Sequence, residues 1–126
     1  MDVFSNAAQP SGMKKLVAAA ILSPEMHPDR VGERITAIRE TLSMTKAAFA
    51  DSIALDRSTL TKVEAGTKGL DIAMGAKIAD LYGIGLDFIY RGILSDAPLE
   101  IRAALAENMH AARTAKVAAR LAPKEH

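Results

Sequence analysis

The sequence contains no cysteine and no tryptophan, and aromatic residues make up only 4% of its 126 residues. The lack of cysteine excludes disulfide bonds, zinc sites with thiolate ligands and thiol catalysis, and it fits a cytoplasmic protein. With so few aromatic side chains, the core must be built from aliphatic residues. Glycine and proline are few, at eight and five residues, and alanine is abundant, so the composition favours helix.

Long apolar runs are also missing. The segment Leu16 to Leu22 follows Lys14 and Lys15 in the manner of a secretion signal, but it is internal and lacks an Ala-x-Ala cleavage pattern. It also falls short of the roughly 20 apolar residues that a membrane span needs. We therefore expect no association with a membrane and a cytoplasmic location.

The residue patterns of catalytic and metal sites are absent as well. His27, His110 and His126 are dispersed along the chain, without a local pair of metal ligands. The sequence shows no Ser, His and Asp arrangement for nucleophilic catalysis and no Gly-rich phosphate loop. We expect a protein that is not an enzyme and that uses no metal and no cofactor.

The overall charge says little about a partner. A net charge of +1 is a weak sign of nucleic-acid binding, because such domains are usually strongly basic. The length allows one domain with short arms. We expect an N-terminal arm at residues 1–28, one domain at 29–94 and a C-terminal helix at 95–126.

Apolar residues recur at helical spacing over most of the chain, and no segment alternates as a strand would. One stripe consists of Val31, Ile35, Ile38 and Leu42. Helices are expected over residues 12–22, 29–42, 45–53, 56–65, 71–82, 86–91 and 98–121, the last one starting at Pro98. The expected N-cap residues are Asp29, Thr45, Asp56 and Asp71. On the helix after Asp71, we expect Ile72, Ile78 and Leu81 to face inward.

Two short capped helices lie close together within residues 45–66, with only Ala54, Leu55 and Asp56 between them. Leu60 and Val63 would anchor the second helix to the core. The outer face of that helix then carries Arg57, Ser58, Thr61 and Lys62. The major groove of DNA admits an α-helix presented in this way, and such a helix reads bases with its N-terminal residues. Residues 57–68 hold three positive side chains and one negative side chain. The net charge of this segment therefore exceeds that of the whole chain.

Residues 31–92 resemble the Cro and phage-repressor (XRE) domain in the spacing of every helix. The residues that carry the resemblance are Arg34, Ile35, Ile38, Arg39, Glu40, Thr45, Lys46, Phe49, Ala50, Ser58, Thr59, Leu60, Val63, Glu64, Gly66, residues 78–84 and residues 86–89. The resemblance implies an all-α fold with a five-helix, lambda-repressor-like helix-turn-helix domain. Here that domain would have a short N-terminal helical arm and a long C-terminal helix.

The resemblance also implies roles for single residues. The base-reading residues would be Arg57, Ser58, Thr61 and Lys62. The phosphate-binding residues would be Thr45, Lys46, Thr59 and Lys68, and Arg39 and Glu64 would form a structural ion pair. Phosphate contacts set the register on the duplex, whereas base contacts set the sequence. Two positions depart from the family: Lys46 stands where Gln is common, and Asp56 where Ser or Thr is commoner.

The last helix lies outside the resemblance. Ile101, Leu105, Met109 and Ala112 share one face at spacings of four, four and three residues. We expect this face to pair with the same helix of a second chain, because closed two-fold dimers are the commonest oligomers. The alternative is that the helix folds back on its own domain.

Three functions fit these patterns. The leading hypothesis is a homodimeric repressor or autoregulator that binds an inverted repeat in double-stranded DNA through the major groove. The second is an antitoxin-type regulator that also holds an unknown protein partner. The third is a bridging or coactivator protein that uses the domain as a scaffold, and the basic residues Arg57 and Lys62 argue against it.

Overall fold

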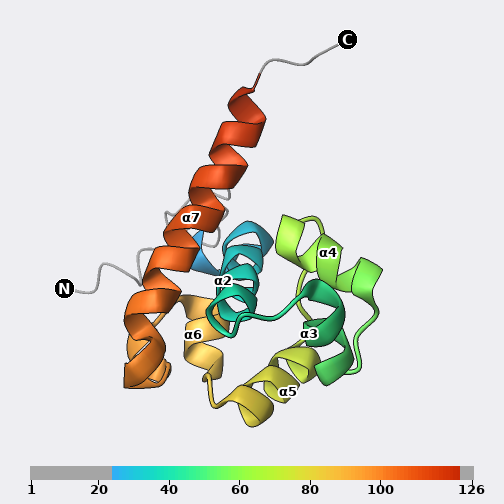
Figure 1. Cartoon of the computed structure of the whole chain (residues 1–126), viewed down its shortest axis with the longest axis vertical. Helices are drawn as coiled ribbons and strands as arrows, with labels where there is room; N and C mark the ends of the chain where they lie inside the picture. Colours follow the sequence, from blue (N-terminus) through green and yellow to red (C-terminus); the bar gives the residue numbers. More distant parts are fainter. Residues whose placement is uncertain (1–23, 123–126) are drawn as a thin grey trace, which may run out of the picture.

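The computed structural model describes residues 24–122 of the chain. The apolar segment expected as a helix at residues 12–22 lies outside the described residues. Within them, helices and short connections make up the whole fold (Figure 1). The α-helices are α2 (Pro28–Thr41), α3 (Lys46–Ser52), α4 (Arg57–Ala65), α5 (Ile72–Tyr82), α6 (Leu86–Arg91) and α7 (Arg102–Leu121). The 3-10 turns are η1 (Pro24–Met26), η2 (Leu94–Asp96) and η3 (Leu99–Ile101).

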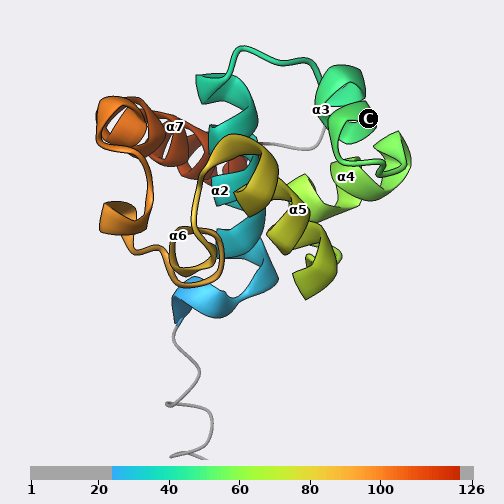
Figure 2. The same cartoon turned by 90° about the horizontal axis from the view of Figure 1, so that it is seen from below.

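Helix α2 is the centre of the molecule, with α7 on one side and α4 on the other (Figures 1 and 2). Its stripe of Val31, Ile35 and Ile38 is buried, and Leu42 packs at the edge of the same core. The buried core side chains are Val31, Ile35, Ala37, Ile38, Phe49, Ala50, Ile53, Leu60, Val63, Ile78, Ile84, Phe88, Ile89, Ala97 and Leu105. The core is therefore aliphatic apart from two phenylalanines, as the composition predicted.

The start of α2 differs from the prediction. Asp29 is not the N-cap: the helix begins at Pro28, and His27 precedes it in an extended conformation without a side-chain cap. Proline fits this first helical position because its φ is already helical and it has no N–H to satisfy. Asp29 instead lies in the first turn, where its carboxylate faces Lys116 and Arg120 of α7.

Helices α2 and α4 approach each other closely at Gly32. A Cβ atom on Gly32 would overlap the carbonyl oxygen of Val63 and lie 2.8 Å from that of Glu64. Both obstacles are backbone atoms of α4, so no side chain can move to make room. The missing side chain of Gly32 thus lets α4 lie directly on α2.

Gly32→Ala should therefore lower the free energy of unfolding by about 1–3 kcal/mol, the usual range for overpacking a core. Urea denaturation measures this change as a lower midpoint. Gly69→Ala is the matched control, because a Cβ atom at Gly69 meets nothing within 4 Å. Equal midpoints for the two variants would contradict the close approach of α2 and α4.

Helix α5 presents a different face to the core than expected. Gly75 and Ile78 are buried, and Tyr82 packs beside them. Ile72 and Leu81, which were expected to face inward, are 62% and 54% exposed. The prediction was wrong because the buried stripe runs through positions 75, 78 and 82, and both residues fall beside it.

The C-terminal segment packs on the domain of its own chain. Pro98 does not start the α-helix: it precedes the 3-10 turn η3, and α7 begins four residues later, at Arg102. Leu105 is fully buried, and Ile101 and Met109 pack against the same core. Asn108 of α7 also donates a hydrogen bond to Thr41 of α2 at 2.9 Å. Three of the four residues of the expected dimer face, Ile101, Leu105 and Met109, thus pack on the core of their own chain.

No helix within residues 24–122 is both long enough and apolar enough to cross a membrane.

Candidate nucleic-acid interface

Helices α3 and α4 form a compact unit joined by a tight turn at residues 53–56. Ala50 is 1% exposed where the two helices meet, so only a small side chain fits there. Leu55 closes the turn: its N–H donates to the carbonyl of Ala50 at 2.8 Å, and its side chain packs on the core. Ala54 takes the left-handed conformation, with φ of 53°, which reverses the chain between the helices.

Both helices start at the predicted caps. The hydroxyl of Thr45 accepts the N–H of Ala48 at 3.1 Å, and the carboxylate of Asp56 accepts the N–H of Thr59 at 3.2 Å. The hydroxyl of Ser58 also donates to Asp56. These hydrogen bonds, that of Ser58 first, lower the pKa of Asp56. The anion lies at the positive end of the α4 dipole, where it stabilises the helix.

The four expected base-reading residues lie on one exposed face of α4. Their side chains are not equally free. Ser58 is hydrogen-bonded to Asp56, and Thr61 donates its hydroxyl to the carbonyl of Arg57 at 3.1 Å. None of the ion pairs among residues 24–122 uses Arg57 or Lys62. On this face, the side chains of Arg57 and Lys62 therefore keep N–H donors that can bind a ligand.

The expected phosphate-binding residues form two groups. Thr45 and Lys46 lie at the start of α3, Thr45 exposed and Lys46 half-buried. Thr59 and Lys68 line one shallow hollow of about 170 Å³ between α4 and the loop that follows it. Gly66 ends α4 in the left-handed conformation, with φ of 81°, and so turns the chain toward Lys68.

Arg39 and Glu64 hold this unit against α2. Arg39 donates from Nε and Nη2 to the two carboxylate oxygens of Glu64, at 2.8 and 3.0 Å. Thr36 donates to the same carboxylate at 3.1 Å. Arg39 also donates from Nη1 to the carbonyl of Met44 at 3.1 Å. The guanidinium thus joins α2, α4 and the turn before α3, and the hydrogen bond to Glu64 raises the pKa of Arg39.

Arg34 has a structural role that the sequence did not predict. Its side chain is 2% exposed. It donates to the carbonyl of Ile89 at 2.9 Å and pairs with the Glu25 carboxylate at 3.1 Å, so it ties α6 and η1 to α2. Burial lowers the pKa of Arg34. Only the family pattern drew attention to this position, because its partners are distant in sequence.

Within residues 24–122, no group of three or more His, Cys, Asp or Glu side chains could hold a metal ion. The arrangement offers an exposed basic helix on a rigid support instead. This combination of fold and face defines a helix-turn-helix DNA-binding domain.

The comparison with protein families agrees with this class. Residues 35–89, from α2 to α6, match the helix-turn-helix family model. No curated protein and no solved structure matches the chain. Residues 35–89 thus form a helix-turn-helix domain, and this match supports both the resemblance to the Cro and phage-repressor (XRE) type and a role as a DNA-binding regulator.

Proposed function

We propose that this protein is a sequence-specific transcriptional regulator whose helix α4 enters the major groove. The observation that carries the proposal is the exposure of Arg57 and Lys62, without ion-pair partners among the described residues, on a helix fixed from behind by Glu64. Arginine and lysine are the usual partners of guanine in the major groove. A rigid support matters because base reading depends on placing these donors accurately.

The remaining residues divide into two groups by their contacts. Ser58 can reach a base only by leaving Asp56, and Thr61 offers its methyl group while its hydroxyl is bonded to the backbone. Thr45, Lys46, Thr59 and Lys68 would hold phosphates on both sides of the groove. The cationic face favours DNA over a protein-binding scaffold, and the cytoplasm is the proposed location.

A homodimer on an inverted repeat is part of the proposal. Two-fold symmetry would place two recognition helices about one DNA turn, roughly 34 Å, apart. Because Leu105 is buried in its own chain, a dimer must use apolar side chains that this structure leaves exposed. Leu99 and Leu121, which are 72% and 79% exposed, are available on the C-terminal segment.

Substitutions should separate base reading from phosphate binding. Arg57→Ala should relax specificity at one position of the site, at a loss of about 1–3 kcal/mol for the preferred base. Lys46→Ala should weaken binding to all sequences alike and reduce the salt slope by about one. Titration of the site and its single-base variants at several salt concentrations measures both effects.

Arg91→Ala is the control for loss of one positive charge, because Arg91 is exposed on α6 and pairs with Asp87. It should leave the preferred bases unchanged. If Arg57→Ala keeps the relative affinities of all site variants, the assignment of Arg57 to base reading is wrong.

A further inference from the structure

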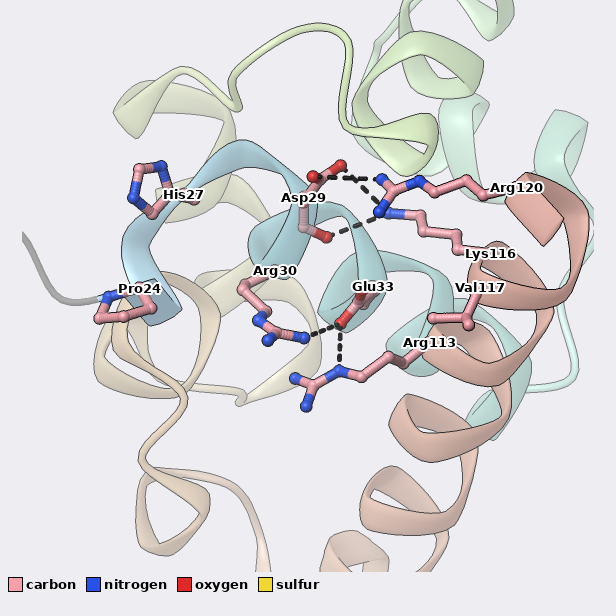
Figure 3. Close-up of a pocket in the computed structure, with 9 residues that line it drawn as sticks. All are labelled: Pro24, His27, Asp29, Arg30, Glu33, Arg113, Lys116, Val117 and Arg120. Atoms are coloured by element: carbon pink, nitrogen blue, oxygen red, sulfur yellow. Dashed lines mark hydrogen bonds and ion pairs between the residues drawn. The ribbon is translucent and has the colours of Figure 1, made fainter.

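A cleft opens between the first two turns of α2 and the C-terminal half of α7 (Figure 3). Its cavity has a volume of about 330 Å³. The charged side chains that line it are Asp29, Arg30 and Glu33 of α2 and Arg113, Lys116 and Arg120 of α7. Figure 3 shows these groups converging from the two helices.

The carboxylates of the cleft are each shared by two cations. Glu33 is 5% exposed. Its Oε1 atom lies 3.5 Å from Nη1 of Arg30 and 3.2 Å from Nε of Arg113. Asp29 lies 3.9 Å from the ammonium of Lys116 and 3.4 Å from the guanidinium of Arg120. Four positive charges therefore face two negative ones, and the cleft has an excess of two positive charges.

The cations also keep donors that the carboxylates do not use. A guanidinium has five N–H donors, whereas Arg113 and Arg120 each make a single hydrogen bond to a carboxylate here. Their side chains are 47% and 65% exposed. The cleft also lies at the N-terminus of α2, where the helix dipole adds positive potential.

We propose that this cleft binds a phosphoryl group, and that its source is a small phosphorylated molecule. A phosphate monoester carries a charge of about −1.5 to −2 at pH 7, which balances the excess charge of the cleft. Planar guanidinium groups match the geometry of phosphate oxygens. The cavity volume lies at the lower end of the range of about 300–1,000 Å³ for small-molecule pockets.

A phosphate of the DNA backbone is the other source of the same chemistry. The cleft lies at the N-terminal end of α2, about 21 Å from the C-terminal end that Thr45 and Lys46 follow. Its Asp29, however, lies beside Gly66 at the end of α4, two residues before Lys68. The charge favours a free phosphorylated ligand, because a backbone phosphodiester carries only one negative charge. The DNA titration below decides between the two sources.

Isothermal titration calorimetry of the full chain with inorganic phosphate, in a phosphate-free buffer of low salt, tests the proposal. The protein should bind phosphate saturably with one site. Arg113→Ala should weaken this binding about tenfold, as expected for loss of one charge-assisted hydrogen bond. Arg91→Ala, which removes an equal charge outside the cleft, should leave it unchanged.

Asp29→Asn provides a variant that gains affinity. It removes one negative charge and releases Lys116 and Arg120, so phosphate binding should strengthen several-fold. A protein damaged by the substitution would lose affinity instead, so this result separates binding from loss of structure.

A DNA titration of Arg113→Ala at several salt concentrations distinguishes the two sources. Phosphate binding that Arg113→Ala weakens and Asp29→Asn strengthens, with an unchanged salt slope for DNA, supports the free ligand. A second outcome is that phosphate does not bind and that Arg113→Ala reduces the salt slope for DNA by about one. This outcome places a DNA phosphate in the cleft and overturns the small-molecule source. Failure to bind phosphate with an unchanged slope, or equal phosphate binding by all variants, overturns the site itself. None of these outcomes depends on base reading by Arg57.

Discussion

Glu64→Ala should lower the free energy of unfolding by about 3–5 kcal/mol, the usual effect of breaking a buried ion pair by removing one partner. The side chains of Arg39 and Glu64 are only 11% and 6% exposed. Without the carboxylate, the Arg39 guanidinium keeps its charge but loses the acceptor of two hydrogen bonds. The hydroxyl of Thr36 loses its acceptor as well. Chemical denaturation measures the loss.

Glu40→Ala is the matched control for Glu64→Ala. Glu40 also pairs with Arg39, at 3.3 Å, but its side chain is 54% exposed. Exposed pairs contribute at most about 1 kcal/mol. A similar small effect of both substitutions would show that the Arg39–Glu64 pair does not hold α4 to α2.

Leu105→Ala should lower the free energy of unfolding by about 2–5 kcal/mol, the usual effect of replacing a buried leucine side chain with a cavity. Leu105 is fully buried between α7 and the domain of the same chain. The loss should therefore be the same at every protein concentration. A residue at a dimer interface would behave differently, because its contribution would grow with the concentration of protomers.

Ile72→Ala is the control, because Ile72 is 62% exposed on α5, away from α7. It should change the stability of the chain by no more than about 0.5 kcal/mol. Light scattering completes the test. A Leu105→Ala protein that unfolds as the parent does but loses its dimer mass would contradict the packing of α7 on its own domain.

Local signals predicted the helix-turn-helix unit well. The caps at Thr45, Asp56 and Asp71 are confirmed, because an N-cap depends on hydrogen bonds within three residues. The expected end of α4 at residue 65 is confirmed as well, because Gly66 takes the left-handed conformation directly after it. The exposed face of α4 followed from the periodicity of Leu60 and Val63.

Long-range packing was less predictable. The structure confirms the apolar stripe of α7. The pattern of a stripe, however, does not predict whether it packs on the same chain or on another one. The prediction chose a second chain, whereas α7 packs on α2 of the same chain and places Ile101, Leu105 and Met109 against its core. The cleft between α2 and α7 could not be predicted from the sequence for a related reason, because Arg113 pairs with Glu33 across 80 residues and Arg120 pairs with Asp29 across 91. No local spacing encodes such pairs.

The most direct test of base reading by α4 is selection of DNA from a random pool by the full-length protein, followed by sequencing of the retained fragments. The parent protein should enrich one site. A variant carrying Arg57→Ala and Lys62→Ala should lose that enrichment while it keeps part of its general affinity for DNA, because Lys46 and Lys68 remain to hold phosphates. Enrichment of the same site by the double variant, or no enriched site with the parent protein, would contradict the assignment of α4 as the helix that reads DNA sequence.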